Sequence, residues 1–466
     1  MKKPPPRRQP PAGAPRAHAE ALAALNLRPE DPLRGEDAII ALLAPLTEGY
    51  PGAFDLKDDC ALLAPPPGTE IVLKTDPIAE GIHFLPGDAP EDIAWKALAV
   101  NTSDIAAKGA APLGYLMALS FPDAPTFGWM ERFASGLKAA QTAFGCRLMG
   151  GDTDRRPGPL TISITLAGTV PQSRMVLRTT ALPNDRLFVS GTLGESGLGL
   201  ALLRNPGLAA VWGPPEAEAD ALIRRYRRPE PRLPLAPALR QFASAAMDLS
   251  DGLIKDCDRL LRASGVAGRI QLARVPFSAA AQRVAAHLPD GEMQLITAGD
   301  DYEILAAVPA AKAAGYVAAA ASAGVAVTDI GTIEPGPRAL VLEDSTGQPL
   351  PMPDRPGGDL FKGDLLGPSR YLRRDAAFRY ARSCCNRTPL LAWSARESST
   401  FSVRSGDRGV DTAAGLRFRA RGTATKGDDN DDRDVGNHPV RIALDRIWRR
   451  DRAPVDGGRC RHAAHA

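Results

Sequence analysis

The sequence predicts an α/β protein with two folded domains, and three observations lead to this fold class. The chain has 466 residues, more than one ordinary hydrophobic core requires, and 44% of them are hydrophobic. Between about residues 30 and 365, strand-like and helix-like segments alternate, with Gly and Pro between them. Residues 160–170 alternate strictly between apolar and polar side chains, which is typical of a strand with one buried face.

The predicted elements follow one another in a mixed order. Residues 70–76 (EIVLKTD) include the β-branched residues Ile71, Val72 and Thr75 and predict a short strand that ends in an acid. Residues 90–112 predict a helix that Gly109 stops, and residues 185–191 begin a second group of strands. Residues 251–265 predict a helix with apolar residues on one face and a terminal Gly. Later strands are predicted in the stretches DYEILAAV, VTDIGTI and ALVLED.

Composition divides the chain into four parts. Residues 1–33 are a basic, Pro-rich tail that we expect to be disordered, and no apolar stretch follows it as a secretory signal would require. Residues 34–172 and 173–365 are the two predicted domains, with the boundary near the stretch QSRMVLRTTALPND. Residues 366–466 are rich in Arg and lack apolar periodicity, so we interpret them as a disordered or non-homologous extension.

The bulk composition excludes several classes of protein. No apolar run reaches the roughly 18 residues of a transmembrane helix, so no membrane partner is expected. The six cysteines form no CxxC pair, which argues against a zinc site or a disulfide framework and favours a reducing cytoplasm. The net charge of +3 argues neither for nor against nucleic acid as a binding partner. A nucleic-acid-binding role for the basic C-terminal tail is an alternative that we do not favour, because no folded nucleic-acid-binding motif accompanies its charges.

Carboxylates recur at the predicted strand ends and helix starts. They are Asp59, Asp76, Asp104, Asp152, Asp248 and Asp251. Each acid alone has a structural explanation as a turn or capping residue, and Ser250 is a possible cap for a helix that begins at Asp251. Asp104 is more informative, because it shares a predicted helix face with the small residues Ala94 and Ala97 and therefore points toward protein or a cleft.

Together these acids point to metal-assisted phosphoryl transfer. Carboxylate oxygens suit Mg²⁺, and several acids imply more than one metal ion. Gly150 and Gly151 precede Asp152 and allow backbone N–H groups to approach a phosphate. No GxxxxGK[ST] motif is present, so the chain is not a P-loop enzyme. The Gly-rich stretch GTLGESGLGLALL lacks the GxGxxG spacing of a dinucleotide site.

A set of ordered motifs resembles the thiamine-monophosphate kinase family over roughly residues 35 to 362. The motifs are DDCALL, KTDPIAEGIHF, KALAVNTSDIAAKGAAP, LMGGDT, MDLSDGLIKD and AGDDYEIL. The resemblance implies the two-domain α+β fold of the aminoimidazole-ribonucleotide-synthetase superfamily. In that fold the N-terminal sheet domain forms a homodimer, and ATP lies in the cleft with the C-terminal domain. The implied reaction is the ATP- and Mg²⁺-dependent phosphorylation of thiamine phosphate to thiamine diphosphate.

The resemblance also assigns roles to residues, none of them catalytic beyond the metal acids. The implied Mg²⁺ ligands are Asp59, Asp76, Asp104, Asp152, Asp248 and Asp251. The implied ATP contacts are Thr75, Lys74, Gly151, Arg178 and Ser250. The implied substrate contacts are His83 and Asp300. Lys74 stands where the family often has Ser, and Asp300 stands where it usually has Glu.

Sister enzymes of the same superfamily are the main alternative. A selenide, water dikinase should carry a reactive Cys and Lys near a Gly-rich N-terminus, and the basic, Pro-rich start of this chain contains no Cys and does not resemble such a segment. A ribonucleotide synthetase should carry a strand end similar to TDGVGTK, whereas this chain reads KTDPIAEGIHF. Both comparisons favour the kinase.

Overall fold

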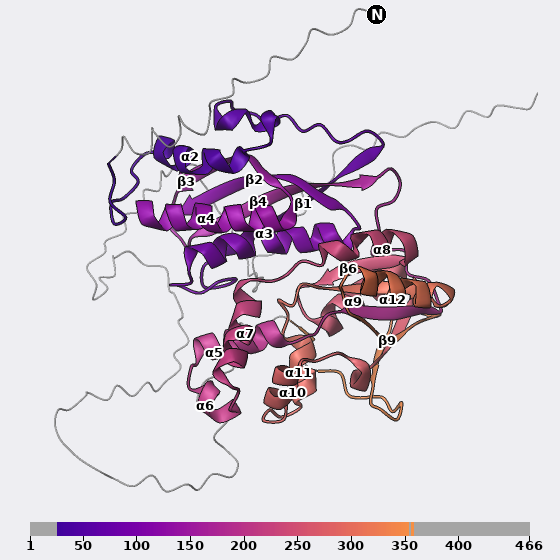
Figure 1. Ribbon diagram of the computed structural model, residues 1–466. Coiled ribbons are helices and arrows are strands. Elements are labelled where there is room, and N and C mark those ends of the chain that lie inside the picture. The colour runs from indigo at the N-terminus through magenta and orange to yellow at the C-terminus, as the bar shows by residue number, and fades with distance from the viewer. Residues whose placement is uncertain (1–25, 354–355, 358–466) are drawn as a thin grey trace, which may run out of the picture. The chain divides into compact units, whose positions relative to one another are not determined.

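The computed structural model describes residues 26–353 and 356–357, all within one compact unit of the chain. These residues form two β-sheets with helices packed against them (Figure 1). The α/β class predicted from the sequence is confirmed. The first 25 residues of the predicted N-terminal tail lie outside the described residues, as does the Arg-rich extension 366–466 on which the nucleic-acid alternative depends.

The first sheet has four strands in the order β1-β4-β2-β3. They are β1 (Thr69–Ala79), β2 (Ala111–Phe121), β3 (Arg147–Arg155) and β4 (Thr161–Pro171). β4 pairs antiparallel with β1 and β2, and β3 pairs parallel with β2. The alternation predicted for residues 160–170 is confirmed as far as Leu166, because Ile162, Ile164 and Leu166 are buried while the polar residues between them are partly exposed; Ala167 and Gly168 are both buried and break it.

Helices α3 (Pro90–Ala107) and α4 (Phe127–Phe144) pack beside this sheet (Figure 1). α3 begins with Pro90 and two acids in its first turn, which suit the free N–H groups and the positive end of the helix dipole. It ends before Gly109, whose φ of +68° is left-handed, so the predicted helix is confirmed as far as Ala107. The same core takes in α2 (Glu36–Leu43), η1 (Ala44–Thr47) and η2 (Pro51–Leu56).

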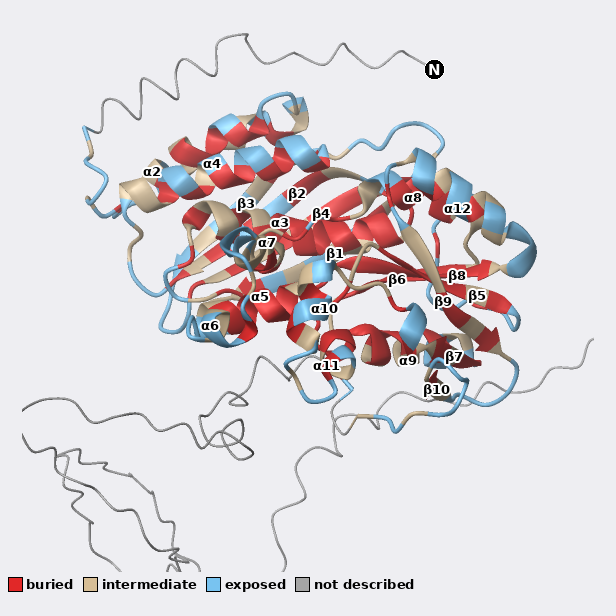
Figure 2. Cartoon of the chain, turned by 60° about the horizontal axis from the view of Figure 1, so that its bottom comes forward, coloured by how far each residue is buried: buried red, intermediate tan, exposed pale blue. Residues whose placement is uncertain are grey.

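The second sheet has six strands in the order β10-β7-β9-β5-β8-β6. They are β5 (Asp185–Ser190), β6 (Ala245–Leu249), β7 (Ala267–Gln271), β8 (Glu303–Pro309), β9 (Val327–Glu334) and β10 (Leu340–Glu343). Both faces are buried, because Leu305 and Ala307 of β8 join one apolar cluster while Ile304 and Ala306 join another. Figure 2 shows α9 (Leu253–Ser264) on one side, with α8 (Ala236–Phe242) and α12 (Ala313–Ser322) on the other.

A group of helices with its own apolar cluster lies beside the second sheet. Its members are α5 (Glu195–Arg204), α6 (Leu208–Trp212), α7 (Glu216–Arg227), α10 (Ala279–Ala285) and α11 (Gly291–Thr297). Short 3-10 helices are η3 (Leu233–Leu235), η4 (Leu272–Arg274) and η5 (Ala310–Lys312). α7 continues into a segment that reaches back to α3, since Trp95 donates its indole N–H to the carbonyl of Pro229 at 2.8 Å.

Two strand boundaries predicted from the sequence are wrong. β1 does not end at Asp76 but continues to Ala79, because it pairs with β4 along its whole length. Pro77 is tolerated there because β1 is an edge strand and needs hydrogen bonds on one side only. Asp152 likewise lies inside β3, which runs on to Arg155 in register with β2. Neither acid is therefore at a strand end.

The predicted start of the helix at Asp251 is also wrong, since α9 begins at Leu253. Gly252 has φ +103° and ψ 151°, outside the helical region, and no side chain caps the helix at this residue. Instead, a carboxylate oxygen of Asp256 accepts the backbone N–H groups of Ser250 (3.0 Å) and Asp251 (2.8 Å). The carboxylate of Asp256, and not the side chain of Ser250, therefore accepts the free backbone N–H groups before this helix.

Among the described residues, no helix is long and apolar enough to cross a membrane. This finding agrees with the hydropathy of the sequence. It does not test the cytoplasmic location expected from the cysteines, which stays a prediction.

Candidate active site

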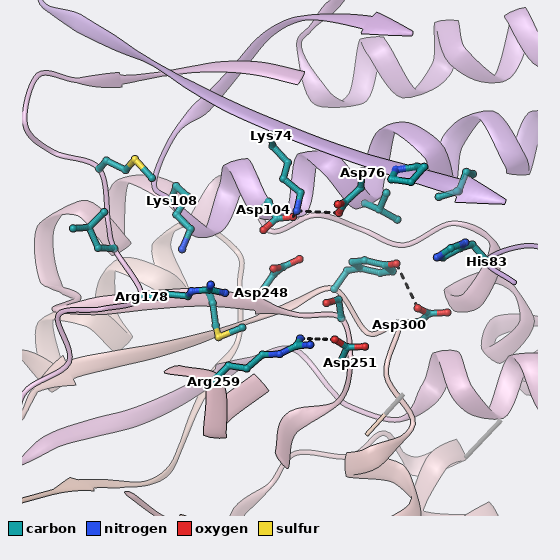
Figure 3. A pocket seen from close by; sticks show the side chains of 18 of the residues that line it. Lys74, Asp76, His83, Asp104, Lys108, Arg178, Asp248, Asp251, Arg259 and Asp300 are labelled. Carbon is teal, nitrogen blue, oxygen red and sulfur yellow. Dashed lines mark hydrogen bonds and ion pairs between the residues drawn. The ribbon is translucent and has the colours of Figure 1, made fainter. Parts of the chain in front are cut away.

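A cavity of about 630 Å³ opens between the two sheets (Figure 3). Residues of β1 and α3 from the first half of the chain line it together with the end of β6 and the loop that follows. The charged and polar lining residues are Lys74, Asp76, His83, Asp104, Lys108, Arg178, Thr179, Asp248, Ser250, Asp251, Arg259, Asp300 and Tyr302. Acids and cations thus share one polar cavity.

The strand β1 and the helix α3 fix the first two acids. In β1, Lys74 and Asp76 point toward the cavity, because side chains two positions apart share a face of a strand. Asn101 anchors the strand to α3 by accepting the backbone N–H of Asp76 at 2.8 Å. Asp104 lies one turn further along the same helix face, where the Lys74 ammonium reaches its Oδ2 at 2.8 Å and that of Asp76 at 3.0 Å. Lys74 therefore holds two carboxylates at once.

The turn between β6 and α9 supplies the other two acids. Asp248 is buried at the end of β6, and Asp251 follows in the turn that Asp256 holds. Arg259, nearly two turns into α9, donates to Asp251 and also to Oδ1 of Asp256 at 2.8 Å. Lys255 adds a second cation at 3.3 Å from Asp251. Asp251 is thus compensated by two cations, whereas Asp248 has no ion pair of its own among the described salt bridges.

The surroundings of these groups shift their pKa values in different directions. Burial, and then the neighbouring charge of Asp104, raise the pKa of Asp248 well above its usual value. Burial opposes ionisation of Asp251 too, but Arg259 and Lys255 outweigh it and lower the pKa of Asp251. Burial also lowers the pKa of Lys108, whose ammonium donates to the carbonyl of Ala246 at 2.7 Å. A cation that enters the cavity would therefore relieve the unfavourable charge of Asp248.

The far end of the cavity is lined by His83 and Asp300 (Figure 3). Nδ1 of His83 accepts the backbone N–H of Ala79 at 3.1 Å, which fixes the imidazole just after β1. The hydroxyl of Tyr302 donates to Oδ1 of Asp300 at 3.4 Å. The Lys96 ammonium lies 3.6 Å from the other carboxylate oxygen of Asp300. This end combines an aromatic nitrogen base with an anchored carboxylate.

Comparisons with known proteins identify the family. The AIR synthase related protein N-terminal domain matches residues 57–170, and the C-terminal domain of the same family matches residues 183–342. The thiamine-monophosphate kinase of Caulobacter vibrioides is 43% identical over 303 residues, which are 64% of this chain and 84% of the relative. The chain belongs to the thiamine-monophosphate kinase family.

Solved structures of the kinase family show the same fold. The thiamine-monophosphate kinase of Stenotrophomonas maltophilia is 33% identical with a TM-score of 0.56, and the match covers 70% of this chain and 95% of that one. A structure described as AaThiL complexed with AMPPCP and TMP is 30% identical with a TM-score of 0.53, and the match covers 68% and 94%. The resemblance noted in the sequence is confirmed, as is the two-domain fold that it implied.

The structure brings together most of the residues that the kinase family assigns. Those that line the cavity are Lys74, Asp76, His83, Asp104, Arg178, Asp248, Ser250, Asp251 and Asp300. Those that do not are Asp59, Thr75, Gly151 and Asp152. Asp59 is exposed in the loop before β1, and Thr75 and Asp152 lie on the face of the first sheet turned away from Asp76. The roles of all these residues stay predictions.

Sequence reasoning missed several residues around the cavity. Lys108 directly follows α3, four residues after Asp104, and lines the same cavity as Asp104. Arg259 follows Asp256 by three residues on one helix face, a spacing that signals an ion pair. No local pattern marks Tyr302 or Lys96, because their partners are distant in sequence or depend on a tight turn.

Proposed function

We propose that this protein transfers the terminal phosphate of ATP to thiamine phosphate and so forms thiamine diphosphate. The observation that carries the proposal is the convergence of Asp76, Asp104, Asp248 and Asp251 on one cavity with cations between them. Phosphoryl transfer needs this combination, since its catalysis is mostly the positioning of groups and the neutralisation of charge. The family, and a relative solved with AMPPCP and TMP, supply the substrate pair.

The reaction breaks one phosphorus–oxygen bond and forms another. A phosphate oxygen of thiamine phosphate attacks the γ-phosphorus of ATP, and the bond to the β,γ-bridging oxygen breaks, so ADP leaves. Lys74, Lys108 and Arg178 are the cavity cations that we assign to the phosphates, because charge-assisted hydrogen bonds to phosphate oxygens are strong. Ser250 adds a neutral partner in the turn before α9. His83 and Asp300 are assigned to thiamine phosphate.

We further propose that Mg²⁺ binds with ATP. Within the described ranges, no three His, Cys, Asp or Glu side chains are grouped so as to hold a metal unaided. Mg²⁺ ordinarily uses one or two carboxylates together with substrate phosphates and water, so this donor set fits an ion that arrives with the nucleotide. The buried Asp248, with its raised pKa, fits the same role. Asp76, Asp104, Asp248 and Asp251 would hold more than one ion between them, and these ions would supply charge neutralisation at the transferred phosphoryl group.

The remaining residues are proposed from the family resemblance alone. Asp59 and Asp152 are proposed as further metal ligands, and Thr75 and Gly151 as ATP contacts. Each lies outside the described cavity, so we rank their roles below those of the lining residues. Comparing the Mg²⁺ dependence of Asp152→Asn with that of wild type tests the exposed acids, and an unchanged dependence would remove Asp152 from the set.

The test of the proposed function is a turnover assay with purified full-length protein, ATP and Mg²⁺. Thiamine phosphate and free thiamine are supplied in parallel. We expect equal amounts of ADP and thiamine diphosphate from thiamine phosphate, no product from thiamine, and no turnover when EDTA replaces Mg²⁺. ADP release without thiamine diphosphate, or turnover of thiamine alone, contradicts the proposal.

Replacement of His83 by Ala should weaken the use of thiamine phosphate selectively. We expect KM for thiamine phosphate to rise about tenfold and KM for ATP to stay within about twofold, because one binding contact is removed from one substrate. His287→Ala is the matched control, since His287 is exposed and does not line the cavity. A lower melting temperature with an unchanged KM would instead make His83 a packing residue.

We propose that residues 34–172 and 173–365 form the two domains and contain all that turnover requires. The described elements run from α2 to β10, between residues 36 and 343, and the family match spans residues 57–342. A fragment of residues 30–365 is therefore expected to keep its kcat within about twofold of the full chain. Its melting temperature should stay within about 3 °C of that of the full chain. Limited proteolysis should yield a similar active fragment. Loss of folding or turnover on trimming would assign a role to the removed ends.

We also propose a homodimer formed through the first sheet. Leu73 of β1 and Leu116 of β2 are 68% and 46% exposed, and Ala118 is exposed on the same face of β2 as Leu116. Sedimentation should give about twice the 49.3 kDa chain mass. Leu116→Lys should shift the protein toward monomer, because an unpaired charge is costly in an apolar interface. Val211→Lys, at a 65% exposed residue of α6, is the control. A wild-type protein that sediments as a monomer would disprove the dimer.

A further inference from the structure

Lys96 is a charged residue at a position where α3 otherwise buries apolar side chains. Only 2% of it is exposed, and its helix neighbours Ala97 and Leu98 are fully buried. Its ammonium lies 3.5 Å from the centroid of the Tyr226 ring, at the end of α7, and 3.6 Å from Oδ2 of Asp300. Lys96 lies in the first half of the chain, and its ammonium thus contacts two residues of the second half.

The partner carboxylate belongs to the substrate end of the cavity. Asp300 sits in a tight turn with φ +60°, and its backbone N–H donates to the carbonyl of Ser250 at 2.9 Å. One carboxylate oxygen accepts the hydroxyl of Tyr302, and the other faces Lys96. Asp300 lines the cavity, whereas neither Lys96 nor Tyr226 does. Lys96 therefore does not line the cavity itself, and its ammonium faces the Asp300 carboxylate, which does.

The same cluster supports the loop of His83. The hydroxyl of Tyr226 donates to the backbone carbonyl of His83 at 3.1 Å. The ring that receives the Lys96 cation on its face is therefore also the group that holds this loop. Both residues assigned to thiamine phosphate are backed by one buried cluster.

We propose that Lys96 is the positioning residue for the substrate end, holding the Asp300 carboxylate in the orientation that binds thiamine phosphate. This inference rests on the proposed function, because it takes thiamine phosphate as the ligand of Asp300. Stability alone does not account for the charge, since an apolar side chain of similar volume is often as stabilising as a buried ion pair. The need to orient the Asp300 carboxylate does account for a buried charge at Lys96.

The test is a double-mutant cycle with Lys96→Met, Asp300→Asn and the double variant. Met keeps the length of the side chain and removes its charge. Binding of thiamine phosphate is measured by calorimetry with AMPPCP and Mg²⁺ present, and KM for both substrates is measured by turnover. We expect Lys96→Met to weaken thiamine phosphate binding about tenfold and to leave KM for ATP within about twofold. The double variant should bind as Asp300→Asn does, because the two residues act as one unit.

Arg186→Met is the matched control. It breaks the half-buried ion pair between Arg186 of β5 and Asp329 of β9, both away from the cavity. It should lower the melting temperature without changing the affinity for thiamine phosphate. If Lys96→Met changes the melting temperature alone, or if its effect on affinity adds to that of Asp300→Asn, Lys96 is structural and the inference fails.

The wild-type protein separates this inference from the proposed function. If wild type binds thiamine phosphate without turning it over, the kinase proposal fails, while the cycle still tests Lys96 through the binding constants. If wild type binds but Lys96→Met binds equally well, only the role of Lys96 fails. If wild type does not bind thiamine phosphate at all, both are overturned.

Discussion

Asp248→Asn is expected to lower kcat by about a hundredfold or more while the ligand-free protein melts at the same or a higher temperature than wild type. Asn preserves the shape of the side chain and removes the charge that we assign to Mg²⁺. Stability should not suffer, because the carboxylate is buried and faces the charge of Asp104. Loss of function with gained stability is typical of a strained functional site.

The pH dependence of melting checks the sign of this effect. The folded protein raises the pKa of Asp248, so the folded state binds that proton more tightly than the unfolded chain does. The charge therefore costs stability at neutral pH, and that cost disappears as the pH falls toward about 4. The advantage of Asp248→Asn should be largest at neutral pH and shrink in acid. Turnover near the wild-type rate at ordinary Mg²⁺ concentrations would remove Asp248 from the metal set.

Asp251→Asn is expected to lose turnover to a similar extent but to change stability in the opposite direction. Arg259 and Lys255 compensate Asp251, and removing its charge leaves both cations without this partner. Because the pair is partly exposed, the loss should be about 1 kcal/mol or less in the free energy of unfolding. Repulsion among the clustered acids would by itself leave the stability of this variant level or raise it. The cations, which the sequence did not pair with Asp251, reverse the expected sign.

Lowering the pH should also reduce the difference in stability between wild type and Asp251→Asn. The pKa of Asp251 is lowered in the folded protein, so its contribution to stability is present above the unfolded pKa near 4 and fades as the pH falls through the folded value. Asp258→Asn serves as the control on the same helix, since Asp258 pairs with Arg338 at the surface and does not line the cavity. Asp258→Asn should lose about as much stability as Asp251→Asn does, but it should keep wild-type turnover. If Asp251→Asn is fully active and needs no more Mg²⁺ than wild type, the metal role of Asp251 is contradicted.

Local patterns in the sequence were sufficient for the elements that present the acids. The alternation of residues 160–170 predicts β4, and the small residues on one face of the 90–112 segment predict that Asp104 points inward. Both predictions succeed because side-chain direction in a strand or helix follows from its own period. The ordered motifs were enough for the family, since each is local and their order is fixed by the chain.

Tertiary structure decided which of the acids meet. Asp76 and Asp152 look equivalent in sequence, yet pairing of β1 and β3 with their neighbours puts their side chains on opposite faces of one sheet. A strand's register depends on its partner, which no local pattern specifies. The sequence by itself determined the fold class, the family and the acids near the site. Only the folded chain determined that Lys74 and Arg259 compensate these acids and that Lys96 meets Asp300, because such contacts join segments whose closeness arises from packing.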